Sequence, residues 1–181
     1  MPAGIDATRA FQPLGIAVLT VSDTRTPAED RSGDTLADRA TAAGHRLVAR
    51  AIVKDDRDAI AGQLRDWIAA VESEVVITTG GTGVTGRDVT PEALALVAET
   101  HIPGFGELFR MLSYQKIGTS SLQSRADAAV AGGTYIFCLP GSPGACRDGW
   151  DEILVHQLDI RHRPCNFAEL MPRLREHEPR G

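Results

Sequence analysis

Residues 75–86 read VVITTGGTGVTG, five β-branched residues followed at once by a run of glycines and threonines. Continuous apolar runs of this kind are typical of strands that are buried on both faces of a parallel sheet. A similar run, LGIAVLTV, occupies residues 14–21, and further runs stand at residues 47–53 and 135–139. The sequence therefore predicts a sheet with buried strands at these four places.

Segments with helical spacing separate the predicted strands. A helix is predicted over residues 35–43, with Asp34 as its N-cap. Thr90 is predicted to cap a second helix, since Pro91 is favoured at the first helical position, and residues 104–112 continue as another helix. Two apolar stripes indicate the remaining helices: Ile60, Leu64, Trp67, Ile68 and Val71, and Trp150, Ile153, Leu154 and Leu158. Alternating strands and helices predict a three-layer α/β domain.

The composition fits one globular domain. The chain has 181 residues, of which 43% are hydrophobic and 24% charged, enough to bury a core. Residues 1–13 look like a flexible N-terminal arm and residues 14–160 like the folded domain. Residues 161–181 are charged and contain proline, so we expect a C-terminal tail that docks or frays.

Several classes of protein fit poorly. A net charge of -5 argues against a nucleic-acid partner, which needs a basic face. The three cysteines are odd in number and lack C-x-x-C spacing, which favours a reducing compartment over a disulfide or zinc framework. A signal peptide and long apolar runs are absent, so we expect a cytoplasmic protein with no membrane partner.

Three unusual loops follow predicted strands, where ligands bind in open α/β sheets. They are Ser22-Asp23, the loop Gly80-Gly81-Thr82-Gly83, and Pro140-Gly141-Ser142-Pro143. Glycines allow close approach of the backbone to a ligand, and successive N–H groups can form an anion-binding nest. A tight turn that needs glycine is the simpler alternative. Neither a Walker loop nor G-x-G-x-x-G is present, so a kinase or a dinucleotide-dependent dehydrogenase is unsupported.

Acidic and polar residues accompany these loops. Asp55 follows the second predicted strand and Asp88 follows the glycine loop, so the two carboxylates are candidates for a Mg²⁺ site. The alternative for each of them is that it caps the helix that comes after it. Ser32, Ser124 and Arg125 are candidates for contacts with an anion, since arginine binds phosphate in a bidentate manner. Exposed polar turns are the alternative for these three residues.

Taken in order, these motifs resemble the MoaB/Mog family of molybdenum cofactor biosynthesis. The resemblance runs from about residue 15 to residue 167. The motifs that carry it are VSD at 21–23, DRSG at 30–33, TGGTG at 79–83, RDVTPE at 87–92, PGFGE at 103–107, SR at 124–125 and LPGSP at 139–143. Three further stretches, FRMLS at 109–113, GTS at 118–120 and RPCNF at 163–167, look most like the B branch.

The resemblance implies a three-layer α/β/α sandwich with a mostly parallel mixed sheet, assembled as a trimer or a dimer of trimers. It implies binding of molybdopterin and transfer of AMP to it from Mg-ATP, with release of pyrophosphate. Asp55 and Asp88 match the acids of metal-assisted adenylyl transfer, and residues 80–83 match the phosphate loop. Ser124 and residues 140–143 match the pterin and nucleotide walls. The molybdate-insertion protein of the same pathway is a further candidate partner.

Two alternatives stay open at this point. The first is a molybdopterin-binding carrier or scaffold without turnover, since some members of the B branch are suspected to bind the pterin only. It differs from the enzyme in whether ATP and Mg²⁺ are consumed. The second is a different nucleotide enzyme on the same type of domain, such as a pyrophosphatase related to competence-damage proteins. Such proteins usually carry a second domain, for which 181 residues leave little room.

Overall fold

The computed structural model describes residues 4–178 and contains a six-stranded sheet in the order β3-β2-β4-β7-β6-β5. The strands are β2 (Gly15–Val21), β3 (Arg46–Val53), β4 (Val75–Thr79), β5 (Thr100–His101), β6 (Asp127–Ala131) and β7 (Thr134–Leu139). β3, β2, β4 and β7 run parallel, whereas β6 is antiparallel to both of its neighbours. The predicted mostly parallel mixed sheet is confirmed.

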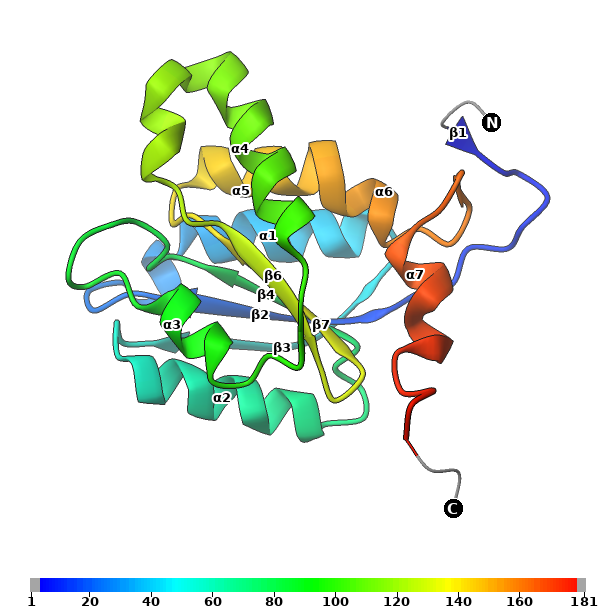
Figure 1. Ribbon diagram of the computed structural model, residues 1–181, viewed down its shortest axis with the longest axis horizontal. Helices are drawn as coiled ribbons and strands as arrows, with labels where there is room; N and C mark the ends of the chain where they lie inside the picture. The colour runs from blue at the N-terminus through cyan, green and yellow to red at the C-terminus, as the bar shows by residue number, and fades with distance from the viewer. Residues whose placement is uncertain (1–3, 179–181) are drawn as a thin grey trace.

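Helices cover both faces of this sheet (Figure 1). One face carries α1 (Arg31–Ala42), α4 (Pro103–Ile117) and α5 (Pro143–Gly149). α5 continues through the π-helical turn η3 (Trp150–Leu154) into α6 (Val155–Gln157). The opposite face carries α2 (Arg57–Ala69) and α3 (Thr90–Ala95). The three-layer α/β/α arrangement is therefore confirmed.

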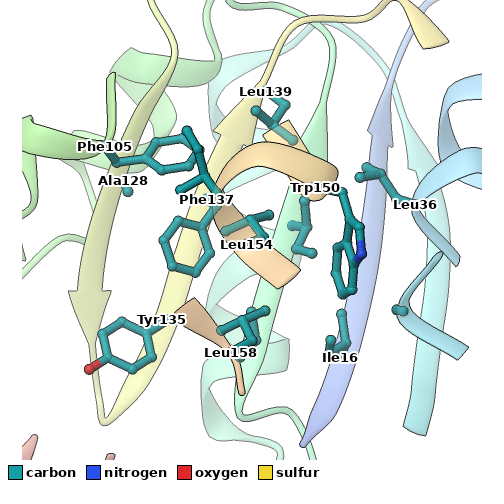
Figure 2. Close-up of a cluster of buried hydrophobic side chains, with 14 of the residues drawn as sticks. Ile16, Leu36, Phe105, Ala128, Tyr135, Phe137, Leu139, Trp150, Leu154 and Leu158 are labelled. Atoms are coloured by element: carbon teal, nitrogen blue, oxygen red, sulfur yellow. The ribbon is translucent and has the colours of Figure 1, made fainter. Parts of the chain in front are cut away.

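The two faces of the sheet explain the continuous apolar runs. Because successive side chains of a strand point to opposite faces, β2 supplies both cores at once. Ile16 belongs to the same hydrophobic cluster as Phe137, Trp150 and Leu154, on the face of the sheet that α1, α4 and α5 cover (Figure 2). Leu19 belongs to the second cluster, on the side of α2 and α3. A strand between two helical layers is buried on both faces, as every residue of β2 and β4 is, and most of these residues are apolar.

The first helix begins earlier than predicted. α1 starts at Arg31, and Asp30 rather than Asp34 is its N-cap, accepting a hydrogen bond from the Gly33 amide at 3.0 Å. The DRSG motif is therefore the first helical turn and not a loop. Gly33 is needed because a Cβ there would lie 2.1 Å from the Asp30 carboxylate. The pattern of polar residues alone could not reveal this packing.

The structure also decides three points about the end of α2, the region 120–131 and the hairpin that follows it. Val71, which was expected to extend the apolar stripe of α2, lies beyond the end of that helix and is exposed. The region 120–131, open between helix and strand, contains the 3-10 turns of η2 (Gly118–Gln123) and the strand β6. The predicted hairpin is confirmed, with Gly132 and Gly133 at positive φ between β6 and β7.

The described parts of the N-terminal arm and of the tail pack together. β1 (Gly4–Ile5) pairs antiparallel with β8 (His162–Arg163), and the Arg163 guanidinium donates to Asp6 at 2.8 Å. The tail continues through α7 (Phe167–Leu170) and η4 (Met171–Arg173). Tyr135 of the sheet donates to the Phe167 carbonyl at 3.1 Å, so this part of the tail docks on the domain. Within residues 4–178, no helix combines the length and apolar character needed to cross a bilayer.

Candidate functional site

A cavity of about 530 Å³ opens at the carboxyl ends of the parallel strands. The loops that follow β2, β4 and β7 all contribute to its lining, as the sequence predicts. These loops supply Ser22, Gly80, Gly81, Thr82, Gly83, Pro140, Gly141 and Ser142. Asp55 after β3 and Asp88 before α3 also face the cavity, and Ser124 closes it from the far side. Residues far apart in the sequence thus meet at one edge of the sheet.

The glycine loop has a backbone that only glycine adopts readily. Gly80 and Gly81 have φ values of 105° and 65°. A Cβ on Gly80 would lie 2.3 Å from the Val21 carbonyl oxygen of the neighbouring strand end. The buried Thr90 hydroxyl donates to the Gly80 carbonyl at 2.8 Å. Thr90 was predicted to cap α3; its side chain instead anchors the glycine loop.

Arg125 stabilises the same loop from outside the cavity. Its guanidinium donates to the Gly83 carbonyl at 2.6 Å and to the Asp88 carbonyl at 2.7 Å, and it pairs with Glu92. Its amide donates to the Thr82 carbonyl at 2.7 Å. Arg125, expected to contact an anionic ligand, lies outside the cavity lining, where its donors are used by the protein.

The two acids of the cavity differ in their surroundings. Partial burial and the nearby charge of Asp88 raise the pKa of Asp55 above the usual value. Burial would also raise the pKa of Asp88, but hydrogen bonds from Thr85 and the Gly83 amide outweigh it and hold that pKa low. The Thr85 hydroxyl and amide both donate to the same Asp88 oxygen, at 2.7 and 2.9 Å. Asp88 is therefore an ionised, fixed carboxylate, and Asp55 is the freer of the two.

The donor set fits a magnesium ion held jointly with a substrate. Within the described part of the chain, no three acidic, histidine or cysteine side chains are grouped so that they could hold a metal ion. Mg²⁺ commonly takes only one or two carboxylates and completes its shell with water and phosphate oxygens. Asp55 and Asp88 supply such a pair, and the raised pKa of Asp55 shows that an uncompensated negative charge is unfavourable there.

Three residues of the loop after β2 line the cavity, and two polar residues nearby support it. Ser22 lines the cavity, and its hydroxyl accepts from the Arg25 amide at 3.1 Å. Asp23 lies behind it, accepting from the Asp55 amide at 3.2 Å and pairing with Arg87. Ser32 is buried and donates to the Gly141 carbonyl at 3.1 Å. Asp23 and Ser32, both predicted to contact a ligand, lie outside this lining and hold neighbouring loops through these contacts, while Asp23 lines an adjoining cavity along β3.

The loop after β7 packs directly on the glycine loop. The Thr79 hydroxyl donates to the Pro140 carbonyl at 2.9 Å, and a Cβ on Gly141 would lie 3.2 Å from the Cα of Gly80. Ser142 caps α5 by accepting from the Ala145 amide at 3.1 Å. Pro143 occupies the first helical position, which suits its fixed φ, and lies outside the lining.

One wall of the cavity was predicted only in part, since residues 120–125 were candidates for their hydroxyls and guanidinium but α4 was not. It is formed by α4 and η2, which carry Phe109, Ser113, Ile117, Ser120 and Gln123 in addition to the predicted Ser124. The first three of these residues stand four apart, so they share one face of α4. That spacing was visible beforehand, but nothing in it distinguishes a cavity wall from a core. Thr24 and Arg25 were missed as well, although they directly follow Ser22-Asp23.

Comparisons with known proteins show the family of this chain. Residues 17–160 match the family described as "Probable molybdopterin binding domain". The chain is 54% identical over 157 residues to molybdenum cofactor biosynthesis protein B of Escherichia coli strain K12, covering 87% of this chain and 92% of the relative. It is 45% identical over 146 residues to the protein of that name from Staphylococcus carnosus, covering 79% of this chain and 85% of the relative.

Solved structures lead to the same family. A crystal structure of molybdenum cofactor biosynthesis protein B superposes with a TM-score of 0.84 at 36% identity, covering 93% of this chain and 99% of that one. The molybdopterin biosynthesis Mog protein of Mycobacterium ulcerans superposes with a TM-score of 0.74 at 29% identity, covering 91% and 99%. The chain therefore belongs to the MoaB/Mog family of molybdenum cofactor biosynthesis proteins.

Proposed function

We propose that this protein binds molybdopterin in the cavity at the strand ends and transfers AMP to its phosphate from Mg-ATP. The observation that carries the proposal is the pair of carboxylates, Asp55 and Asp88, in the same cavity as the glycine loop. Family membership supports molybdopterin as the ligand. The carboxylate pair supports the finer claim that a metal-dependent nucleotide reaction takes place there.

The residues of the chain would contribute mainly by positioning and by neutralising charge, which dominate phosphoryl and nucleotidyl transfer. An oxygen of the pterin phosphate attacks the α-phosphorus of ATP, the bond from that phosphorus to the bridging oxygen breaks, and pyrophosphate leaves. The Gly80–Gly83 loop would orient the phosphates through its backbone. Asp55 and Asp88 would hold Mg²⁺, which when bound lowers the negative charge on the phosphates.

The competing candidate is a carrier that binds molybdopterin without turnover. The observation in its favour is that the Asp88 carboxylate already accepts hydrogen bonds from its own loop, so part of its role is structural. The two candidates differ in whether ATP is consumed. Each is compatible with the cavity, and only a reaction assay separates them.

The deciding experiment incubates the protein with molybdopterin, ATP and Mg²⁺ and measures pyrophosphate and adenylylated pterin. We expect both products from the wild-type protein and neither from Asp55→Asn, while the variant still binds molybdopterin. Asp55 is the better residue to change, because the Asp88 carboxylate also stabilises the loop around Thr85. Binding without product in the wild-type protein would support the carrier. Absence of molybdopterin binding would contradict both candidates.

The expected homo-oligomer stays a prediction. Three apolar side chains, Leu108, Met111 and Tyr114, are exposed along α4 at intervals of three residues and form one ridge. Such a ridge is a candidate interface between copies of the chain. Light scattering of the wild-type protein and of Met111→Lys would test it, since a charged residue in the ridge should weaken association.

A further inference from the structure

Arg25 differs from the two other arginines that stand around the cavity. Arg125 pairs with Glu92 on the outer side of the glycine loop, and Arg87 pairs with Asp23. Arg25 lines the cavity itself and is the one basic side chain among the described residues of that lining. A site for an anionic ligand therefore has a single built-in positive side chain.

The guanidinium of Arg25 is held between two of the strand-end loops. It donates to the Gly141 carbonyl at 2.7 Å and to the hydroxyl of the buried Ser32. Ser32 in turn donates to the same Gly141 carbonyl at 3.1 Å. These contacts use two of the five N–H donors of a guanidinium, so others are left for a ligand. Arg25 is thus oriented before any ligand arrives.

The positive charge of Arg25 is only weakly compensated by the protein. The carboxylate within ion-pair range is that of Asp30, 4.0 Å away. Asp30 is buried and is already satisfied by the Thr20 hydroxyl at 2.7 Å and by Arg50 at 3.1 Å. The other charged residues of the lining are Asp55 and Asp88, so without Arg25 the described lining would carry only negative charge.

We propose that Arg25 binds the phosphate of the pterin and makes the site selective for the phosphorylated form of its ligand. This inference rests on the proposed function, which supplies a phosphorylated pterin as ligand. Arginine suits the task because its planar fork binds phosphate oxygens in pairs. Arg25 and Ser22 also line an adjoining cavity of about 660 Å³ along β3, so a ligand that reaches from the glycine loop into that second cavity passes this side chain.

The test compares two ligands on matched variants. The affinities of wild-type protein and Arg25→Gln are measured for molybdopterin and for the same pterin after removal of its phosphate by a phosphatase. We expect Arg25→Gln to weaken binding of the phosphorylated form by about 10- to 100-fold, the range for a hydrogen bond to a charged group. Binding of the dephosphorylated form should change by less than about twofold, because that form offers Arg25 no charge.

Two further variants control for charge and folding. Arg31→Gln removes one positive charge from the exposed start of α1, outside the cavity lining, and should leave both affinities unchanged. Ser32→Ala keeps the charge but removes an anchor of Arg25, so it should weaken binding of the phosphorylated form alone, by about 2- to 10-fold. If Arg25→Gln does not fold, Ser32→Ala and Arg25→Lys carry the test. Lysine should restore charge but only part of the selectivity.

The outcomes separate this inference from the proposed function. An equal loss of both affinities in Arg25→Gln would assign Arg25 a structural role, and wild-type protein that binds both ligands equally would contradict the selectivity; in both cases molybdopterin binding stands. Wild-type protein that binds neither ligand would overturn the proposed function, and the role of Arg25 with it. A loss confined to the phosphorylated ligand supports the inference whether or not AMP is transferred.

Discussion

The two walls of the cavity are built in different ways. The strand-end loops are joined by hydrogen bonds from Thr79 to the Pro140 carbonyl, from Thr90 to the Gly80 carbonyl and from Arg25 to the Gly141 carbonyl. The opposite wall is an arch formed by α4 and η2, which Figure 1 shows projecting past the layer of α1 and α5. Ile117 of this arch lines the cavity but is 57% exposed. We therefore expect substitutions in the loops to lower stability, and substitutions at exposed positions of the arch such as Ile117 to weaken ligand binding instead.

The largest effect is expected at Gly80. Gly80→Ala places a Cβ 2.3 Å from the Val21 carbonyl oxygen at a φ of 105°. The strain and the clash together should lower the free energy of unfolding by about 2–5 kcal/mol. Gly86→Ala is the matched control, because a Cβ there meets nothing within 4 Å. Urea unfolding of both variants checks the contrast, and equal stabilities would show that the close approach of Gly80 to the Val21 carbonyl does not restrict this position.

The next effect concerns the anchor of the same loop. Thr90→Val keeps the shape of the side chain but removes the buried hydroxyl that donates to the Gly80 carbonyl. An unsatisfied buried carbonyl should cost about 1–3 kcal/mol in urea unfolding. Thr90→Ser, which keeps the hydroxyl, should lose less. An unchanged free energy of unfolding in Thr90→Val would show that the loop does not depend on this contact.

A smaller and opposite effect is expected at Asp55. Its raised pKa means that the folded state favours the protonated form of Asp55. The contribution of Asp55 to stability is therefore complete below its pKa in the unfolded chain and is lost as the pH rises through its pKa in the folded protein. Asp55→Asn removes this penalty and should stabilise the protein at pH 7 by less than about 1 kcal/mol. The gain should shrink as the pH falls toward about 4, the usual pKa of aspartate. Thermal unfolding across that range checks the sign, and a destabilised variant at pH 7 would contradict it.

The smallest effect on stability is expected at the arch. Ile117→Ser changes a half-exposed side chain and should alter the free energy of unfolding by less than about 0.5 kcal/mol. Because Ile117 lines the cavity, molybdopterin should nevertheless bind more weakly. Parallel binding and unfolding measurements separate the two effects. A large loss of stability with unchanged binding would reverse the comparison of the two walls.

Local chemistry let the sequence predict the sheet and the loops that end its strands. The β-branched run at residues 75–79 and the glycines that follow it combine strand propensity with turn requirements, and neither depends on distant residues. Parallel strands share one carboxyl edge, so the convergence of Ser22, Gly80 and Gly141 followed from the strand pattern alone. The position of Asp55 at this edge, in the same cavity as Asp88, followed for the same reason.

Tertiary packing decided which of these residues reach the cavity and which support them. Arg125 and Ser32 were expected at the ligand, but backbone carbonyls of neighbouring loops occupy their donors. Arg25 reaches the cavity because those same loops fold around it. The wall formed by α4 depended likewise on contacts between segments far apart in the chain. Composition and spacing determine what a residue can do, whereas its partners in the folded chain determine which of its donors remain free.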